Sequence, residues 1–148
     1  MLNFINFIMP VDSARRFARI RKEHRTELAQ DYVEIILDLI EEDGEARLTD
    51  LAGRLGVAHP TVSKALRRLE TEGLVSLRPY RAVRLTVQGH DLAVQCRVRH
   101  HTVAAFLVAL GLDAETAELE AEGIEHHIGE TTLRLMSDFA GRNGLSTA

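Results

Sequence analysis

The sequence has 148 residues, 45% of them hydrophobic, so it can bury one core or two small domains that share one, and overall disorder is excluded. The formal charge is −4, but the charges are unevenly distributed: residues 1–30 and 61–84 are basic, and residues 101–148 are acidic. This asymmetry indicates that the basic segments bind a polyanion and that the acidic segment binds a cation or nothing.

The single cysteine, Cys96, excludes disulfide frameworks and cysteine-based zinc sites and favours a cytoplasmic protein. The apolar opening Met1–Met9 is too short to span a bilayer and makes a poor signal peptide, so no membrane segment is expected.

Three helical patterns occupy the first half of the chain. We expect helices over residues 28–42, 50–55 and 60–72. Gly44 supplies a stop for the first, Thr49 is a candidate cap of the second, and Gly56 ends it. Pro60 stands where a first-turn proline belongs, and Gly73 ends the third helix. Before residue 28, Asp12 or Ser13 could cap a helix through the basic stretch Ala14–Arg25, although nothing demands that this stretch be ordered.

The pattern changes after residue 73. Two short stretches rich in β-branched residues, 74–77 and 82–87, flank the turn Arg78–Arg81, which predicts a small hairpin. Further helices are expected over residues 87–110, from 114 through Leu119 toward His127, and over 131–139. The predicted fold is therefore mainly α with a small β-hairpin. We divide it into a basic N-terminal extension, a winged helix-turn-helix domain and a helical metal-binding and dimerisation domain, over residues 1–27, 28–88 and 89–148.

The segment Leu48–Leu69 has the pattern of a helix-turn-helix, with apolar residues on the inner faces of two helices and Gly56 between them. The second helix carries polar and basic groups that can reach bases and phosphates in the major groove. The hairpin adds arginines suited to the DNA backbone, as in a wing. The helix-turn-helix also occurs in proteins that do not bind DNA, so the basic hairpin is what favours DNA here. The candidate DNA-binding residues are His59, Pro60, Thr61, Ser63, Lys64, Arg67, Arg68, Arg78, Arg81 and Arg84.

One such domain reads few base pairs, and two-fold dimers are the usual remedy. The C-terminal helices carry apolar side chains that could form such an interface. Packing within one subunit explains the same residues equally well. They are Leu133, Leu135, Met136 and Phe139.

Carboxylates and histidines gather at helical spacings in two segments. Asp31 and Glu34 are three residues apart, and by themselves they read most simply as a solvated helix face. The same holds for His100 alone. The segment 122–127 is less ordinary, because Glu122, Glu125 and His126 share one helical face with no lysine or arginine between residues 113 and 133. Such acceptors repel one another unless a cation intervenes, which favours a metal. Only one member of each pair, His100/His101 and His126/His127, should face a given site.

These segments resemble the diphtheria-toxin-repressor family, and within it the manganese transport regulator branch. The resemblance rests on Asp31-Tyr-Val-Glu34, the helix-turn-helix and hairpin, Arg99-His100 and Ala121-Glu-Gly-Ile-Glu-His-His127. It covers about residues 28–139 in one continuous order. The acidic and histidine segments are its most specific parts.

The resemblance implies a site for two metal ions per subunit. Its ligands would be Asp31, Glu34, His100, Glu122, Glu125 and His126, with bridging glutamates. The iron-sensing relatives have a thioether and a thiol at the positions of Asp31 and Glu122. Oxygen and imidazole donors alone favour Mn²⁺, although Zn²⁺ or Cu²⁺ would often bind more tightly and Fe²⁺ stays an alternative.

The resemblance further implies a homodimer that binds a palindromic operator in double-stranded DNA when metal-loaded and represses manganese uptake genes. No organic substrate is expected. An iron(II)-responsive repressor of the same fold is the first alternative. A dinuclear metallohydrolase is a second, but no substrate pocket or general base is evident. A third is a winged-helix regulator that senses an organic ligand or a protein partner instead of a metal. We expect a regulator and not an enzyme.

Overall fold

The computed structural model describes residues 13–145, with side chains from residue 26 onward. Met1–Met9 lies outside this range, as do most side chains of the basic extension. The elements are helices α1 (Ser13–Asp43), α2 (Leu48–Leu55) and α3 (His59–Thr71), strands β1 (Val75–Ser76) and β2 (Arg84–Leu85), helices α4 (Val87–Leu110) and α5 (Ala114–Ile124), the 3-10 turn η2 (Glu125–His127) and helix α6 (Glu130–Arg142). The fold class predicted from the sequence is confirmed. None of the described helices is both long and apolar enough to cross a membrane.

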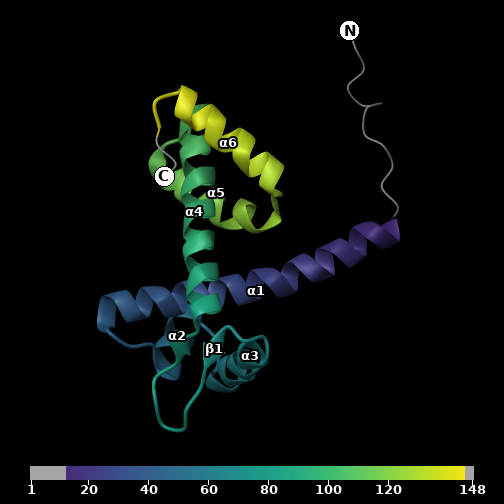
Figure 1. Ribbon diagram of the computed structural model, residues 1–148. Helices are drawn as coiled ribbons and strands as arrows, with labels where there is room; N and C mark the ends of the chain where they lie inside the picture. The colour runs from purple at the N-terminus through teal and green to yellow at the C-terminus, as the bar shows by residue number, and fades with distance from the viewer. Residues whose placement is uncertain (1–12, 146–148) are drawn as a thin grey trace.

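Helix α1 lies across the middle of the molecule (Figure 1). The helix-turn-helix and the hairpin lie on one side of it, and α4 rises from it on the other side, with α5 and α6 beside α4. The predicted helix over residues 28–42 is thus the second half of a longer one. It buries Tyr32, Val33, Ile36 and Leu39, whose spacing gives one apolar stripe, and it ends where Gly44 takes a left-handed backbone at φ +80°.

The helix-turn-helix forms as the apolar pattern predicts, with one correction. Thr49 does not cap α2. The amides of Asp50 and Leu51 donate to the carbonyl of Arg47 at 3.1 and 3.0 Å, which makes Arg47 the cap residue, although its side chain makes no capping hydrogen bond. The Thr49 hydroxyl lies inside the first turn and donates to the carboxylate of Asp50 instead. The predictions for Pro60, which lies in the first turn of α3, and for the end of that helix are confirmed.

The hairpin is shorter than the sequence suggests, because its backbone groups find partners elsewhere. The paired residues are Val75 with Leu85 and Ser76 with Arg84. Beyond them, the amide of Leu77 donates to the carboxylate of Glu70 at 2.9 Å. The amide of Val83 donates to the carbonyl of Ala46 at 2.8 Å, which ties the hairpin to the end of α1.

The C-terminal helices begin within one residue of the predicted positions, but α5 ends early, near residue 125, and α6 runs to Arg142, three residues past the predicted end at Phe139. The Thr86 hydroxyl accepts from the amide of Gly89 at 3.0 Å and caps α4, which ends at Gly111. Asp113 caps α5 in the same way. The helix expected to run toward His127 stops at Ile124, and the chain continues as the 3-10 turn η2.

Two hydrophobic clusters hold the described chain together. The first joins the buried stripe of α1 to α2, α3, the hairpin and the start of α4. The second joins the far half of α4 to α5 and α6 and includes Leu133 and Met136, while Phe139 packs edge-to-face on Phe106. These residues therefore serve the core of one subunit, whereas Leu135 is exposed.

The start of α4 depends on a glycine that cannot be enlarged. A Cβ at Gly89 would stand 2.0 Å from the carbonyl oxygen of Leu74. We expect Gly89→Ala to destabilise the fold by at least about 2 kcal/mol in urea unfolding, because α4 would have to move away from the backbone of Leu74. The control is Gly53→Ala in the middle of α2, where a Cβ meets nothing within 4 Å and alanine should stabilise by about 0.5–1 kcal/mol. Equal stability of the two variants would contradict this account.

Candidate metal centre and nucleic-acid interface

Side chains from four elements meet where α1 crosses α4 and η2. Among the described residues, two groups of three potential ligands have donor atoms that all lie within 4.8 Å of one another. Together the groups contain all six residues proposed from the sequence: Asp31, Glu34 and His126 in one, His100, Glu122 and Glu125 in the other. The structure thus brings these side chains together, while their role as ligands stays a prediction.

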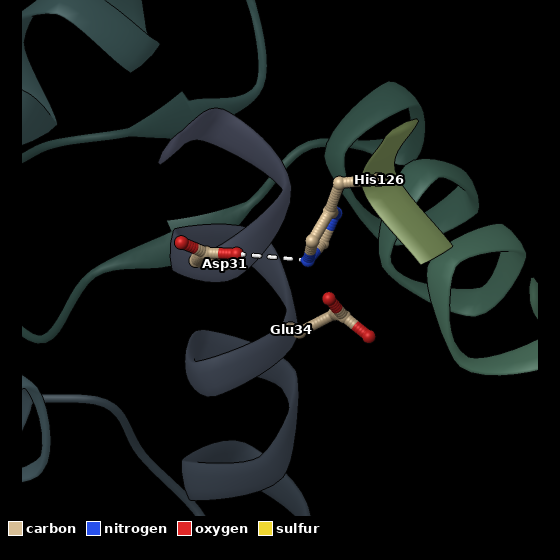
Figure 2. Close-up of side chains that lie close together, drawn as sticks. All are labelled: Asp31, Glu34 and His126. Carbon is tan, nitrogen blue, oxygen red and sulfur yellow. Dashed lines mark ion pairs between the residues drawn. The ribbon is translucent and has the colours of Figure 1, made fainter. Parts of the chain in front are cut away.

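The first group joins α1 to η2 (Figure 2). Nε2 of His126 lies 3.3 Å from Oδ1 of Asp31, and the Glu34 carboxylate, one turn further along α1, points toward the same space. The other ring nitrogen, Nδ1, lies 3.0 Å from Oε1 of Gln30. The imidazole ring of His126 is thus hydrogen-bonded to Gln30 through Nδ1 and faces the carboxylate of Asp31 with Nε2. We call these the outer and the inner side of the ring.

The second group joins α4 to the end of α5. Nδ1 of His100 lies 2.6 Å from Oε2 of Glu125 and 3.5 Å from Oε2 of Glu122. Its Nε2 lies 2.7 Å from Oε2 of Glu118, a residue that the sequence analysis did not select. His101, the next residue, is exposed, so only one member of this histidine pair faces the site, as predicted.

Glu125 connects the two groups. Oε2 faces His100, and Oε1 lies 3.6 Å from Nε2 of His126. The residue is 1% exposed, which is rare for a carboxylate, and among the described side chains no lysine or arginine pairs with its carboxylate directly. Its backbone is held by Arg99, whose guanidinium donates to the carbonyl of Glu125 at 3.0 Å and to that of Ile128 at 2.6 Å and also pairs with Glu130.

Crowded carboxylates make the centre electrostatically unfavourable without a cation. Burial, and then the charges of Glu125, Glu122 and Asp31, raise the pKa of Glu34 to about 8. Burial also raises the pKa of Asp31, against the opposing effect of His126. The hydrogen bond that His100 donates to Glu125, followed by the one that it donates to Glu118, raises the pKa of His100 to about 9. Oxygen and imidazole donors suit a hard divalent cation. Such a cation would displace the protons that these groups retain at neutral pH.

The helical spacing of Glu122, Glu125 and His126 predicted one shared face, and the structure divides them. Because α5 gives way to η2, His126 turns toward α1 while the two glutamates face α4. His127 is exposed, with Nε2 3.8 Å from a carboxylate oxygen of Glu27. Gln30 and Glu118 were missed because no spacing rule says which neighbouring helix a polar residue faces.

The candidate DNA-binding residues lie on the exposed side of α3 and on the hairpin. All are exposed except Ser63 and Arg68, which are half-buried, and Arg68 pairs with Glu72 at 2.7 Å. Arg78, Arg81 and Arg84 line one groove of about 350 Å³ in the hairpin. At its tip Tyr80, not selected from the sequence, is fully exposed with a left-handed backbone (φ 59°), rare for a residue with a side chain.

Comparison with known proteins assigns both halves. Residues 24–83 match the iron dependent repressor N-terminal DNA binding domain, and residues 86–143 match the iron dependent repressor metal binding and dimerisation domain. The chain belongs to the iron-dependent repressor family. Its partners are accordingly DNA, a divalent metal and a second copy of the chain, and it is a regulator and not an enzyme.

Individual members of the family resemble the chain closely. It is 50% identical over 128 residues to the transcriptional regulator MntR of Escherichia coli O6:H1, covering 86% of this chain and 83% of that protein. It is 34% identical over 109 residues to MntR of Bacillus subtilis strain 168, covering 74% and 77% of the two chains. The structure of a manganese-dependent transcriptional repressor in complex with manganese matches with a TM-score of 0.65 at 34% identity, over 78% of this chain and 52% of that one. The manganese regulator SloR matches with a TM-score of 0.66 at 28% identity, over 76% and 53%. The chain thus spans about half the length of these solved structures, and the resemblance seen in the sequence is confirmed.

The raised pKa values predict how the stability of the metal-free protein depends on pH. Between pH 4.5 and about 8 the folded protein holds a proton at Glu34 that the unfolded chain has lost, so stability should fall as pH rises. His100 acts in the same direction between pH 6.5 and about 9. In urea unfolding with chelator present, Glu34→Gln should remove most of the fall between pH 5 and 6.5 and reduce the fall between pH 6.5 and about 8, where His100 still contributes. Stability that rises with pH in both proteins would contradict the described electrostatics.

Proposed function

We propose that this protein is a manganese(II)-dependent transcriptional repressor that binds operator DNA as a dimer when metal-loaded. The observation that carries the proposal is the pair of carboxylate–histidine groups joined by Glu125, within a chain that belongs to a family of metal-dependent DNA-binding regulators. The similar MntR proteins and the manganese-bound repressor structure support manganese as the ion. A regulator of transcription works beside the chromosome, so the proposed function also implies the cytoplasm.

The proposed ligands are Asp31, Glu34 and His126 for one ion and His100, Glu122 and Glu125 for the other, with Glu125 facing both. Two groups of donors support two ions per subunit. All six side chains offer oxygen or imidazole nitrogen, a set that suits Mn²⁺ but also accepts Fe²⁺. An iron(II)-responsive repressor of the same fold is therefore the second candidate, supported by the family to which both domains belong.

Helix α1 provides the proposed link between metal and DNA. It packs on the helix-turn-helix through its buried stripe, and it presents Asp31 and Glu34 to η2. A second connection lies further along, where Arg97 of α4 donates to Asp38 at 2.7 Å and to Glu41 at 2.8 and 3.1 Å. A cation shared by α1 and η2 would fix the DNA-binding unit relative to the dimerisation unit. If only that arrangement fits DNA, linkage requires metal and DNA to strengthen each other's binding by the same factor.

In the dimer we propose, the two α3 helices enter successive major grooves of a palindromic operator, roughly 34 Å apart. The polar side chains of α3 would contact bases and phosphates there. The hairpin arginines, Arg78, Arg81 and Arg84, line one groove, and like charges held this close favour an anion such as phosphate.

The test is fluorescence anisotropy of a labelled palindromic operator of the family type, with chelated protein and then with Mn²⁺, Fe²⁺ under anaerobic conditions, or Mg²⁺. We expect tight binding with Mn²⁺ and none with Mg²⁺. Glu122→Gln should lower the affinity for Mn²⁺ by ten-fold or more and raise the Mn²⁺ concentration needed for DNA binding, because a charged donor is lost. Glu120→Gln, an exposed residue of the same helix, should behave as wild type.

Each outcome of this experiment has a defined meaning. Binding that is equal with chelator and with metal would overturn the metal switch and leave a winged-helix regulator with another signal. A response to Fe²⁺ at lower concentration than to Mn²⁺ would assign the protein to iron.

Removal of a cation from α3 should weaken DNA binding without affecting the metal centre. We expect Arg67→Ala to lower operator affinity by roughly five- to a hundred-fold, and, if the residue contacts phosphate, to reduce the salt dependence by about one counterion. The affinity for Mn²⁺ measured without DNA should not change. Arg134→Ala on α6, remote from α3, is the matched control for loss of one positive charge. An equal loss in both variants would show that only net charge matters.

A further inference from the structure

His100 has hydrogen-bonding partners on both ring nitrogens. Nδ1 faces the carboxylates of Glu125 and Glu122 at 2.6 and 3.5 Å. Nε2 faces Oε2 of Glu118 at 2.7 Å. Glu118 and Glu122 are one turn apart on α5, so both are turned toward α4, but they meet opposite edges of the same imidazole ring. The ring itself is largely buried, with 17% of its side chain exposed.

The chemistry of this arrangement restricts how the ring can bind a cation. A neutral imidazole has one N–H and one lone pair, and a metal needs the lone pair. An ionised carboxylate can only accept, so the nitrogen next to Glu118 must carry a hydrogen. Nδ1 also faces a carboxylate, that of Glu125, so a cation bound beside the proposed ligands Glu122 and Glu125 would have to displace the hydrogen on Nδ1.

His126 shows the same logic with a weaker outer partner. Its outer nitrogen is Nδ1, which lies 3.0 Å from the amide oxygen of Gln30, and its inner nitrogen is Nε2. The amide of Gln30 is neutral and can either donate or accept, so it does not impose a tautomer as strictly as a carboxylate does. The two histidines thus face the centre through opposite nitrogens, and only His100 has a charged outer partner among the described residues.

We infer that Glu118 is a positioning residue for the metal centre. It holds His100 with Nε2 protonated, leaves Nδ1 as the nitrogen that can bind a cation beside Glu122 and Glu125, and raises the affinity of this group for a divalent cation. Carboxylates behind metal-binding histidines act in this way in general, and their loss typically weakens metal binding about 10- to 100-fold. The inference rests on the proposed function, because it requires that the group binds metal.

The exposure of Glu118 allows an effect on metal binding to be distinguished from an effect on the stability of the fold. Its side chain is 58% exposed, and ion pairs at such positions contribute little to folding. A change at residue 118 should therefore alter metal binding while leaving the melting temperature of the metal-free protein nearly unchanged.

The experiment compares wild type with Glu118→Ala, Glu118→Gln and Glu120→Gln. Mn²⁺ binding is measured by calorimetry on the full chain without DNA. We expect Glu118→Ala to lower the affinity of one class of sites about 10- to 100-fold. Glu118→Gln should lose less, because its amide oxygen still accepts from Nε2–H. Glu120→Gln, two residues away on another face of α5, should match wild type.

A second readout follows the ring nitrogens directly. With ¹⁵N-labelled histidine and diamagnetic Zn²⁺ in place of Mn²⁺, NMR should show His100 protonated at Nε2 in wild type and a mixture of bound nitrogens in Glu118→Ala. Unchanged affinity and an unchanged nitrogen pattern in Glu118→Ala would overturn the inference alone. Equal losses in the alanine and glutamine variants would also overturn it and make Glu118 a ligand itself. Wild-type protein that binds no Mn²⁺ would overturn the proposed function and this inference together.

Discussion

The buried carboxylate of Glu125 is the constraint on which the centre depends. Removing a carboxylate from water is unfavourable unless charge or hydrogen bonds compensate. Here the compensation comes from His100 on one oxygen, while His126 lies further away beside the other, and Arg99 fixes the backbone that carries the residue. Because these partners belong to α4 and η2, the position of Glu125 ties the orientation of both histidines to the packing of the helices. Any cation bound between them must be sensitive to that packing.

Helix α1 belongs to both functional parts of the molecule at once. One face of it completes the core of the helix-turn-helix, and another offers Asp31 and Glu34 to η2. The DNA-binding unit therefore needs no separate relay to respond to metal. A cation that fixed α1 against η2 would also fix the DNA-binding unit that packs on α1, and Arg97 adds a second contact between α1 and α4.

Local chemistry made most of the fold predictable from sequence. Gly44, Gly111 and Asp113 mark helix ends by their own backbone or side-chain properties, and the structure places them there. Thr49 failed as a cap because α2 begins one residue before it, at Leu48, so that Thr49 already lies inside the first turn. The 3-10 turn after Ile124 and the contacts of Gln30 and Glu118 depend on neighbouring helices, which spacing within one segment cannot reveal. Spacing alone favoured a metal only for Glu122, Glu125 and His126, and the resemblance to a family added Asp31, Glu34 and His100 to the proposed ligands.

The buried cysteine has a consequence for how the protein reacts with oxidants. Cys96 lies on α4 near the carboxylates, and burial together with the charges of Glu34 and Glu125 raises the pKa of its thiol to about 12. At neutral pH almost none of it is thiolate, the form that peroxides attack and that soft metals prefer. Oxidants should therefore react only slowly with Cys96, so the chain, which has no other cysteine, offers no readily oxidised thiol beside the candidate metal centre.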